Sequence, residues 1–163
     1  MTTFPSNQPT GTRHTVGVRS WQLDPKGRWA AAAYVGYPRL RSATVYTANT
    51  ALDGSGSLTS VFTAGPQGSQ VSWLAVVSTG DPADSILNVF VDVEGAIALF
   101  DQIDLDNPAA ASTVAPAYRT VRSYANGTAY PDWLLPAGAI VRVAVTATPT
   151  AGTLNVFLQA KDF

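Results

Sequence analysis

Residues 139–148 read AIVRVAVTAT, and this stretch decides the fold. Val141, Val143 and Val145 fall on one side of an extended backbone, whereas Arg142 between them falls on the other. A period of two is typical of a strand with one buried face, because successive side chains alternate across a pleated sheet. The stretch therefore predicts a half-buried β-strand.

Similar runs recur through the rest of the chain after Ser42, separated by the turn-favouring residues glycine, proline, aspartate and asparagine. The run VSWLAVV at 71–77 is apolar on both faces, which is typical of a central strand covered on both sides. In the last run Phe157 lies among polar positions, where an exposed ring would suit contact with a neighbour. We expect strands at about 43–52, 57–64, 69–79, 85–94, 96–105, 117–124, 139–148 and 153–161.

These strands predict an all-β fold, in which residues 42–163 form an antiparallel two-sheet β-sandwich of jelly-roll type. A chain of 163 residues can bury a core of its own without a metal or a disulfide, and this one has no cysteine. It contains no apolar run long enough to span a bilayer or to act as a secretion signal. We therefore expect synthesis in the cytoplasm and no membrane partner.

Residues 1–41 differ from the rest in charge and composition. They hold six bases against one acid, a net charge of +5, whereas residues 42–163 hold four bases against ten acids, a net charge of −6. Four prolines and scattered glycines argue against a helix or regular strands, and the aromatic residues are unlike those of a solvated tail. We predict an extended basic N-terminal arm that becomes ordered on a partner.

The arm lacks a dense block of lysine and arginine, so we expect it to bind an acidic protein surface rather than nucleic acid. Aromatic anchors and arginines are the side chains that contribute most to such contacts. The predicted partner-binding residues are Arg13, Arg19, Trp21, Lys26, Arg28, Trp29, Tyr34, Tyr37, Arg39 and Arg41.

Catalytic and metal sites have few candidates. His14 is the only histidine and lies far from any acid in the sequence, so no catalytic grouping can be built around it. Asp101, Asp104 and Asp106 could offer oxygen ligands to calcium, but they lack the glycine turn and closing glutamate of an EF-hand loop. A solvated strand end is the other interpretation. We expect no enzyme activity, no cofactor and no metal.

A group of aromatic residues near a proline-rich loop leaves a second kind of site open. These rings could form a stacking platform for a sugar, or they could belong to the core. The residues are Tyr118, Tyr124, Tyr130 and Trp133.

Three stretches resemble small virion proteins encoded among the head genes of tailed bacteriophages, over about the last two-thirds of the chain. They are TANTALDGSGSLTSVFTAG at 47–65, GSQVSWLAVVSTGDP at 68–82 and LPAGAIVRVAV at 135–145. The resemblance implies a jelly-roll protein that decorates or cements the capsid, or forms the base of a head fibre, and it brings no catalytic residues.

The resemblance further implies a homo-oligomer, with a trimer favoured, bound to the major capsid protein on the capsid exterior and made in the bacterial host cytoplasm. The charge of the arm adds the expectation that residues 1–41 anchor it there. Two alternatives stay open: a head- or tail-fibre module that recognises host-surface carbohydrate, and a polysaccharide depolymerase domain.

Overall fold

The computed structural model describes residues 13–16, 19–23, 29–31, 37–80, 83–105, 118–124 and 133–163. The chain divides into two compact units, one of residues 1–37 with Phe163 and one of residues 38–162. No helix long and apolar enough to cross a membrane occurs among the described residues. The strands are β1 (Arg13–Val16), β2 (Arg19–Leu23), β3 (Trp29–Ala31), β4 (Tyr37–Val45), β5 (Thr59–Thr63), β6 (Ser69–Ser78), β7 (Ser85–Val93), β8 (Ala96–Leu105), β9 (Tyr118–Ser123), β10 (Trp133–Leu135), β11 (Ile140–Val145) and β12 (Leu154–Asp162).

The first unit contains a three-stranded antiparallel sheet in the order β1-β2-β3. In its register Trp21 lies opposite His14 and Ala31, and Leu23 lies opposite Trp29. The sequence analysis expected an arm without regular strands here. The difference has a local cause, because strands of three to five residues are too short for alternation to stand out, while pairing satisfies their backbone groups.

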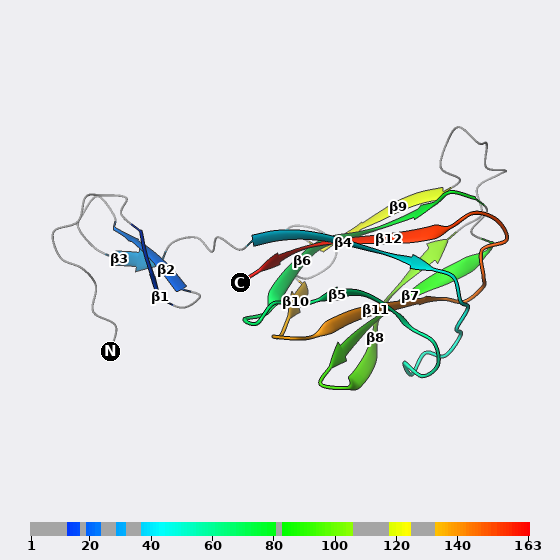
Figure 1. The fold of residues 1–163 in the computed structure, drawn as a ribbon, viewed down its shortest axis with the longest axis horizontal. Helices are drawn as coiled ribbons and strands as arrows, with labels where there is room; N and C mark the ends of the chain where they lie inside the picture. Colours follow the sequence, from blue (N-terminus) through cyan, green and yellow to red (C-terminus); the bar gives the residue numbers. More distant parts are fainter. Residues whose placement is uncertain are drawn as a thin grey trace. The chain divides into compact units, whose positions relative to one another are not determined.

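The second unit is a β-sandwich of a five-stranded and a four-stranded sheet (Figure 1). The five-stranded sheet runs β10-β6-β12-β4, with β9 also paired to β6, and the four-stranded sheet runs β5-β11-β7-β8. The pairs are nested along the chain: β7 with β8, β6 with β9 and β10, β5 with β11, and β4 with β12. A long hairpin wrapped into two sheets in this way is a jelly roll, so the predicted fold class is confirmed.

All eight expected strands overlap observed strands of the sandwich, and the differences lie at the bounds of the first strand and at β10, which was not expected. β4 covers Tyr37–Val45 rather than 43–52, because Pro38 is tolerated on a strand at the edge of a sheet. The boundary between the units consequently falls after Tyr37 rather than after Arg41. Arg39 and Arg41, which the sequence analysis assigned to the arm, lie on β4 of the sandwich.

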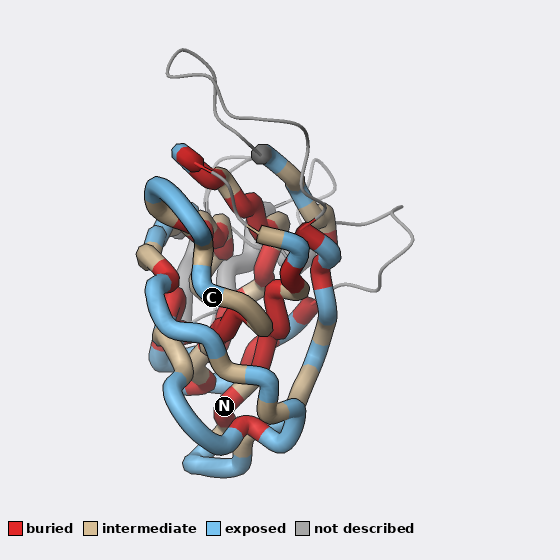
Figure 2. The backbone as a smooth tube through the Cα atoms, turned by 90° about the vertical axis from the view of Figure 1, so that its right-hand side faces the viewer, coloured by how far each residue is buried: buried red, intermediate tan, exposed pale blue. Residues whose placement is uncertain are grey.

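The core lies between the two sheets and takes side chains from both. Leu74 and Leu158 come from the five-stranded sheet, Leu87 and Val143 come from the four-stranded sheet, and all four are fully buried. Figure 2 shows the same pattern along the chain, with buried stretches in the strands and exposed stretches in the loops. The alternation that predicted the strands therefore also selects the residues of the core.

The outer face of the four-stranded sheet is covered by the chain's own loop of residues 46–58. Gly54 has a φ of 80°, and a Cβ there would come within 2.4 Å of Ile97 Cγ2 on β8, so only glycine lets the loop lie this close. Asn49 stabilises the loop through two hydrogen bonds. Its Nδ2 donates to the carbonyl oxygens of Ser55 at 2.7 Å and Ser57 at 3.1 Å.

Candidate interaction surface

The described residues contain no group of three or more histidine, aspartate or glutamate side chains that could hold a metal ion. Strand register separates two of the acids considered as ligands, since Asp101 lies opposite Val89 and Asp104 lies opposite Ile86. The Asp101 carboxylate accepts a hydrogen bond of 2.8 Å from the Tyr124 hydroxyl. Asp106 lies outside the described residues.

Two of the four predicted stacking aromatics are packed between strands. The Trp133 ring stacks on Phe100 at 4.1 Å between centroids and meets Tyr124 edge-on at 4.9 Å. Tyr124 and Trp133 are buried, so neither offers a ring face on which a sugar could stack. Their cluster joins β8 of one sheet to β10 and the residue after β9 of the other. The Tyr118 side chain and Tyr130 lie outside what the structure describes.

The ten predicted partner-binding residues are spread over both units. The three-stranded sheet holds Arg13 on β1, Arg19 and Trp21 on β2, and Trp29 on β3. The edge strand β4 of the sandwich holds Tyr37, Arg39 and Arg41. Lys26, Arg28 and Tyr34 lie outside the described residues. The structure thus divides the predicted set between two units.

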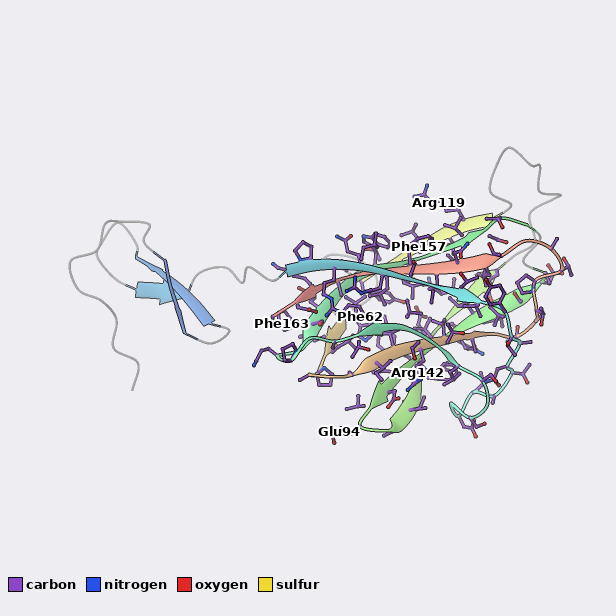
Figure 3. The ribbon with its side chains drawn as sticks, in the orientation of Figure 1. Phe62, Glu94, Arg119, Arg142, Phe157 and Phe163 are labelled. Atoms are coloured by element: carbon purple, nitrogen blue, oxygen red, sulfur yellow. The ribbon has the colours of Figure 1, made fainter. Side chains whose placement is uncertain are left out.

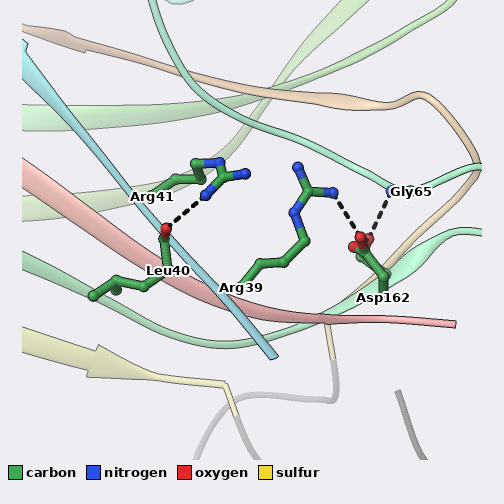
Figure 4. A network of polar contacts seen from close by, with 6 residues as sticks. Arg39, Leu40, Arg41, Gly65 and Asp162 are labelled. Carbon is green, nitrogen blue, oxygen red and sulfur yellow. Dashed lines mark hydrogen bonds and ion pairs between the residues drawn. The ribbon is translucent and has the colours of Figure 1, made fainter. Parts of the chain in front are cut away.

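Arg39 makes its contacts within the sandwich (Figure 4). Its Nη1 lies 2.6 Å from Asp162 Oδ2, and its guanidinium lies 5.0 Å from the centre of the Phe62 ring. Ser69 Oγ donates to Asp162 Oδ1 at 2.6 Å and accepts from the Gly65 N–H at 3.0 Å. This network ties the start of β4 to the end of β12.

The network changes the acidity of Asp162. Burial raises the pKa of this carboxyl, but hydrogen bonds from Ser69, Arg39 and Gly65, together with the charge of Arg39, outweigh that effect. The pKa of Asp162 therefore lies below its ordinary value, and the ionised form is the one that the folded chain favours.

The outer face of the five-stranded sheet, opposite the core, carries an apolar patch. Leu74 and Val76 of β6 belong to the core, so strand alternation turns Trp73, Ala75 and Val77 outward. A soluble sheet normally places polar residues on such a face.

Neighbouring strands extend this patch on both sides of β6. Ala75 lies between Val121 of β9 and Phe157 of β12, and Val121 is 52% exposed. Leu134 of β10, 60% exposed, lies beside Gln70 of β6. We call the surface formed by the outward residues of β6 and their paired neighbours on β9, β10 and β12 the outer β6 face.

A cation stands at each end of the outer β6 face. Arg119 is paired opposite Val77, and Lys161 is paired opposite Gln70. The stretch of β6 between Gln70 and Val77 spans about 23 Å at about 3.3 Å per residue. Among the residues that the structure describes, this face carries no acid.

The two sheets of the sandwich carry opposite charges. The strands of the five-stranded sheet hold five bases and one acid, which are Arg39, Arg41, Arg119, Arg122, Lys161 and Asp162. The strands of the four-stranded sheet hold one base and three acids, which are Arg142, Asp92, Asp101 and Asp104. Such an asymmetry favours a partner surface of the opposite sign on each side.

Sequence reasoning found part of the outer β6 face and missed the rest. The two-sided apolar run around Trp73 and the ring of Phe157 were visible signals in the sequence. Val121 and Leu134 gave no signal, because their place on the face depends on which strands pair with β6.

Comparisons with known proteins show no family for this chain. No protein-family model matches it, and no curated protein matches it.

Solved structures with some similarity come from particles of infectious bursal disease virus. A protein chain in the structure of a viral particle of this virus is 14% identical to this chain, with a TM-score of 0.35. The match covers 93% of this chain and 36% of that chain. A chain in the structure of the Gt strain is 10% identical, with a TM-score of 0.35. The match covers 99% of this chain and 40% of that chain. A chain in the structure of a VP2 subviral particle is 11% identical, with a TM-score of 0.30. The match covers 98% of this chain and 40% of that chain. This chain thus spans well under two-thirds of those proteins, and a likeness this low carries no argument about function.

Proposed function

We propose that this chain is a non-enzymatic structural protein of a virion, a decoration or cement protein that binds the outer capsid surface of a tailed bacteriophage. In this proposal the N-terminal unit anchors the protein on the major capsid protein, and the jelly roll faces water. The resemblance of residues 47–65, 68–82 and 135–145 to phage head proteins supports the capsid as partner.

The observation that carries the proposal is the division of the chain at Tyr37. The sandwich after this point has a core of its own, whereas residues 1–37 hold four bases, one acid and both Trp21 and Trp29. A small basic unit rich in aromatic residues suits attachment to an acidic protein surface, and repeated copies on a symmetric lattice would strengthen weak single contacts.

Removing residues 1–36 is expected to abolish capsid binding and leave the sandwich folded, because β4 then stays intact from Tyr37 onward. Binding is measured by sedimentation with capsids from which the protein has been removed. Folding is measured by urea denaturation. Removing residues 1–41 is the control for the boundary, and it should also lower stability because Arg39 is lost. Undiminished binding by the protein without residues 1–36 would contradict the proposal.

Replacing Trp21 and Trp29 with alanine is expected to weaken capsid binding more than replacing Arg13 and Arg19. Buried aromatic anchors contribute about 2 kcal/mol or more at protein interfaces, whereas exposed ion pairs contribute about 1 kcal/mol or less. All four residues lie on strands of the three-stranded sheet, so the two double variants are matched. If the arginine variant binds more weakly than the tryptophan variant, charge rather than aromatic burial holds the protein on the capsid.

A further inference from the structure

The two sheets of the sandwich differ in how their outer faces are covered. Loop 46–58 lies on the four-stranded sheet, where Phe90, beside Arg142 on the outer side, is fully buried. On the five-stranded sheet Val121 and Leu134 stay more than half exposed. The sequence of β6 nevertheless has the two-sided apolar pattern of a strand with cover on both faces. No described segment of the sandwich covers Val121 or Leu134, and a second molecule would complete that cover.

The cations of the outer β6 face define the chemistry of its occupant. A partner must bring apolar side chains to the centre, against the strand neighbours of the buried Ala75, and carboxylates toward Arg119 and Lys161 at the ends. The outer β6 face of a second copy does not meet this requirement. Two such faces in contact would bring the cations of both copies together, and neither face carries a described acid to neutralise them. Face-to-face pairing is therefore disfavoured.

The chain itself carries a surface of the required kind, on loop 46–58. Leu52 is 52% exposed, which gives an apolar contact, and the exposed Asp53 beside it supplies a carboxylate. Glu94, in the turn before β8, is exposed as well, and Gly54 rests on Ile97 of the same strand. We call the surface made by Leu52, Asp53 and Glu94 the acidic loop surface.

The outer β6 face and the acidic loop surface belong to opposite sides of the sandwich. Figure 3 shows Arg119 and Phe157 on one side and Glu94 and Arg142 on the other. One copy can therefore use both surfaces at the same time, each toward a different neighbour. Contacts of this heterologous kind form closed rings when the rotation between copies closes, and open stacks when it does not.

We propose that the outer β6 face of one copy binds the acidic loop surface of a second copy, so that the chains associate head to tail. Val121 and Phe157 would contact Leu52 of the second copy, while the terminal cations meet its carboxylates. The proposal does not rest on capsid binding, because it concerns the free protein.

The test uses two charge variants of the full chain, followed by equilibrium sedimentation over a range of protein concentrations. The face variant carries Arg119→Glu and Lys161→Glu, and the loop variant carries Asp53→Asn and Glu94→Lys. Asn at position 53 keeps a side-chain oxygen for the Ser55 N–H, so the turn is preserved. For each variant alone, we expect an association constant that is lower than that of the unaltered chain by a factor of about ten or more.

Mixing the two variants is the decisive measurement. The unaltered face of the loop variant fits the unaltered loop of the face variant. The acidic face of the face variant also fits the loop surface that carries Glu94→Lys, so association should return in the mixture. Arg41→Glu is the control for a single charge reversal, because it inverts one exposed cation on edge strand β4, outside the outer β6 face. This control should associate like the unaltered chain.

Three results would overturn the proposal. One is an unaltered chain that stays monomeric at every concentration, and another is a face variant that associates as strongly as the Arg41→Glu control. A mixture that stays as weakly associated as its folded components would exclude the head-to-tail arrangement. If the free protein is monomeric and the face variant loses only capsid binding, the outer β6 face binds the capsid instead.

Discussion

Replacing Trp133 with alanine is expected to lower the free energy of unfolding by about 3–5 kcal/mol, the range for deleting a large buried aromatic side chain. Trp133 is buried and touches two other rings, Phe100 on β8 and Tyr124 after β9. These contacts join the open edges of the two sheets. Deletion would leave a cavity at that junction, and Phe100, already 42% exposed, would lose the ring on which it stacks.

The matched control is Trp73→Ala, the same substitution on the outer β6 face. Trp73 is only half-buried, so its removal should lower the free energy of unfolding by about 2 kcal/mol or less. Urea denaturation of both variants measures the difference. Equal losses would show that the ring cluster contributes no more to stability than a surface side chain does.

Replacing Asp162 with asparagine is expected to lower the free energy of unfolding by about 1–3 kcal/mol at pH 7. Asparagine keeps the shape of the side chain but removes the charge that faces Arg39 at 2.6 Å, and Arg39 is then partly buried without its counterion. Denaturation of both proteins in urea at pH 7 measures this loss.

The loss should shrink as the pH falls below about 4, near the ordinary pKa of an aspartate. The pKa of Asp162 is lower in the folded chain than in the unfolded chain, so the unfolded chain takes up this proton first. The contribution of the ionised carboxylate is complete above the unfolded pKa and disappears as the pH drops through the folded pKa. At pH 3 the two proteins should differ less than at pH 7.

Asp53→Asn serves as the control for this pH effect. Hydrogen bonds from Ser55 also lower the pKa of Asp53, but this carboxyl is fully exposed in loop 46–58 and forms no ion pair with the described residues. Its replacement should change stability at pH 7 less than the replacement of Asp162 does. A difference between wild type and Asp162→Asn that stays constant from pH 7 to pH 3 would rule out the carboxylate as its cause.

Most of the sandwich could be predicted from local patterns, and the least regular parts could not. The alternation in VRVAV at 141–145 places β11 correctly because period two is a property of the strand alone. The start of β4 at Tyr37 was not predicted, since Pro38 normally argues against a strand and only an edge position tolerates it. β10 has three residues, too few for a period to show.

The candidate surface was only partly predictable for a related reason. Phe157 signalled an outward-facing ring by its place among polar residues. Arg39, which the sequence assigned to the arm, gave no sign that Asp162 would be its partner. Those two residues are separated by most of the chain. A pairing over that distance depends on strand register, which a local pattern does not contain.

The sequence by itself determined the all-β class, the approximate strands and the residues that form the core, because these follow from periodicity and turn chemistry over short distances. Tertiary structure alone decided which apolar side chains of the described strands stay exposed. It placed Val121 and Phe157 on either side of Ala75 and laid loop 46–58 over the other sheet. The physical reason is that burial of a sheet face depends on what the folded chain brings across it, and that arrangement is non-local.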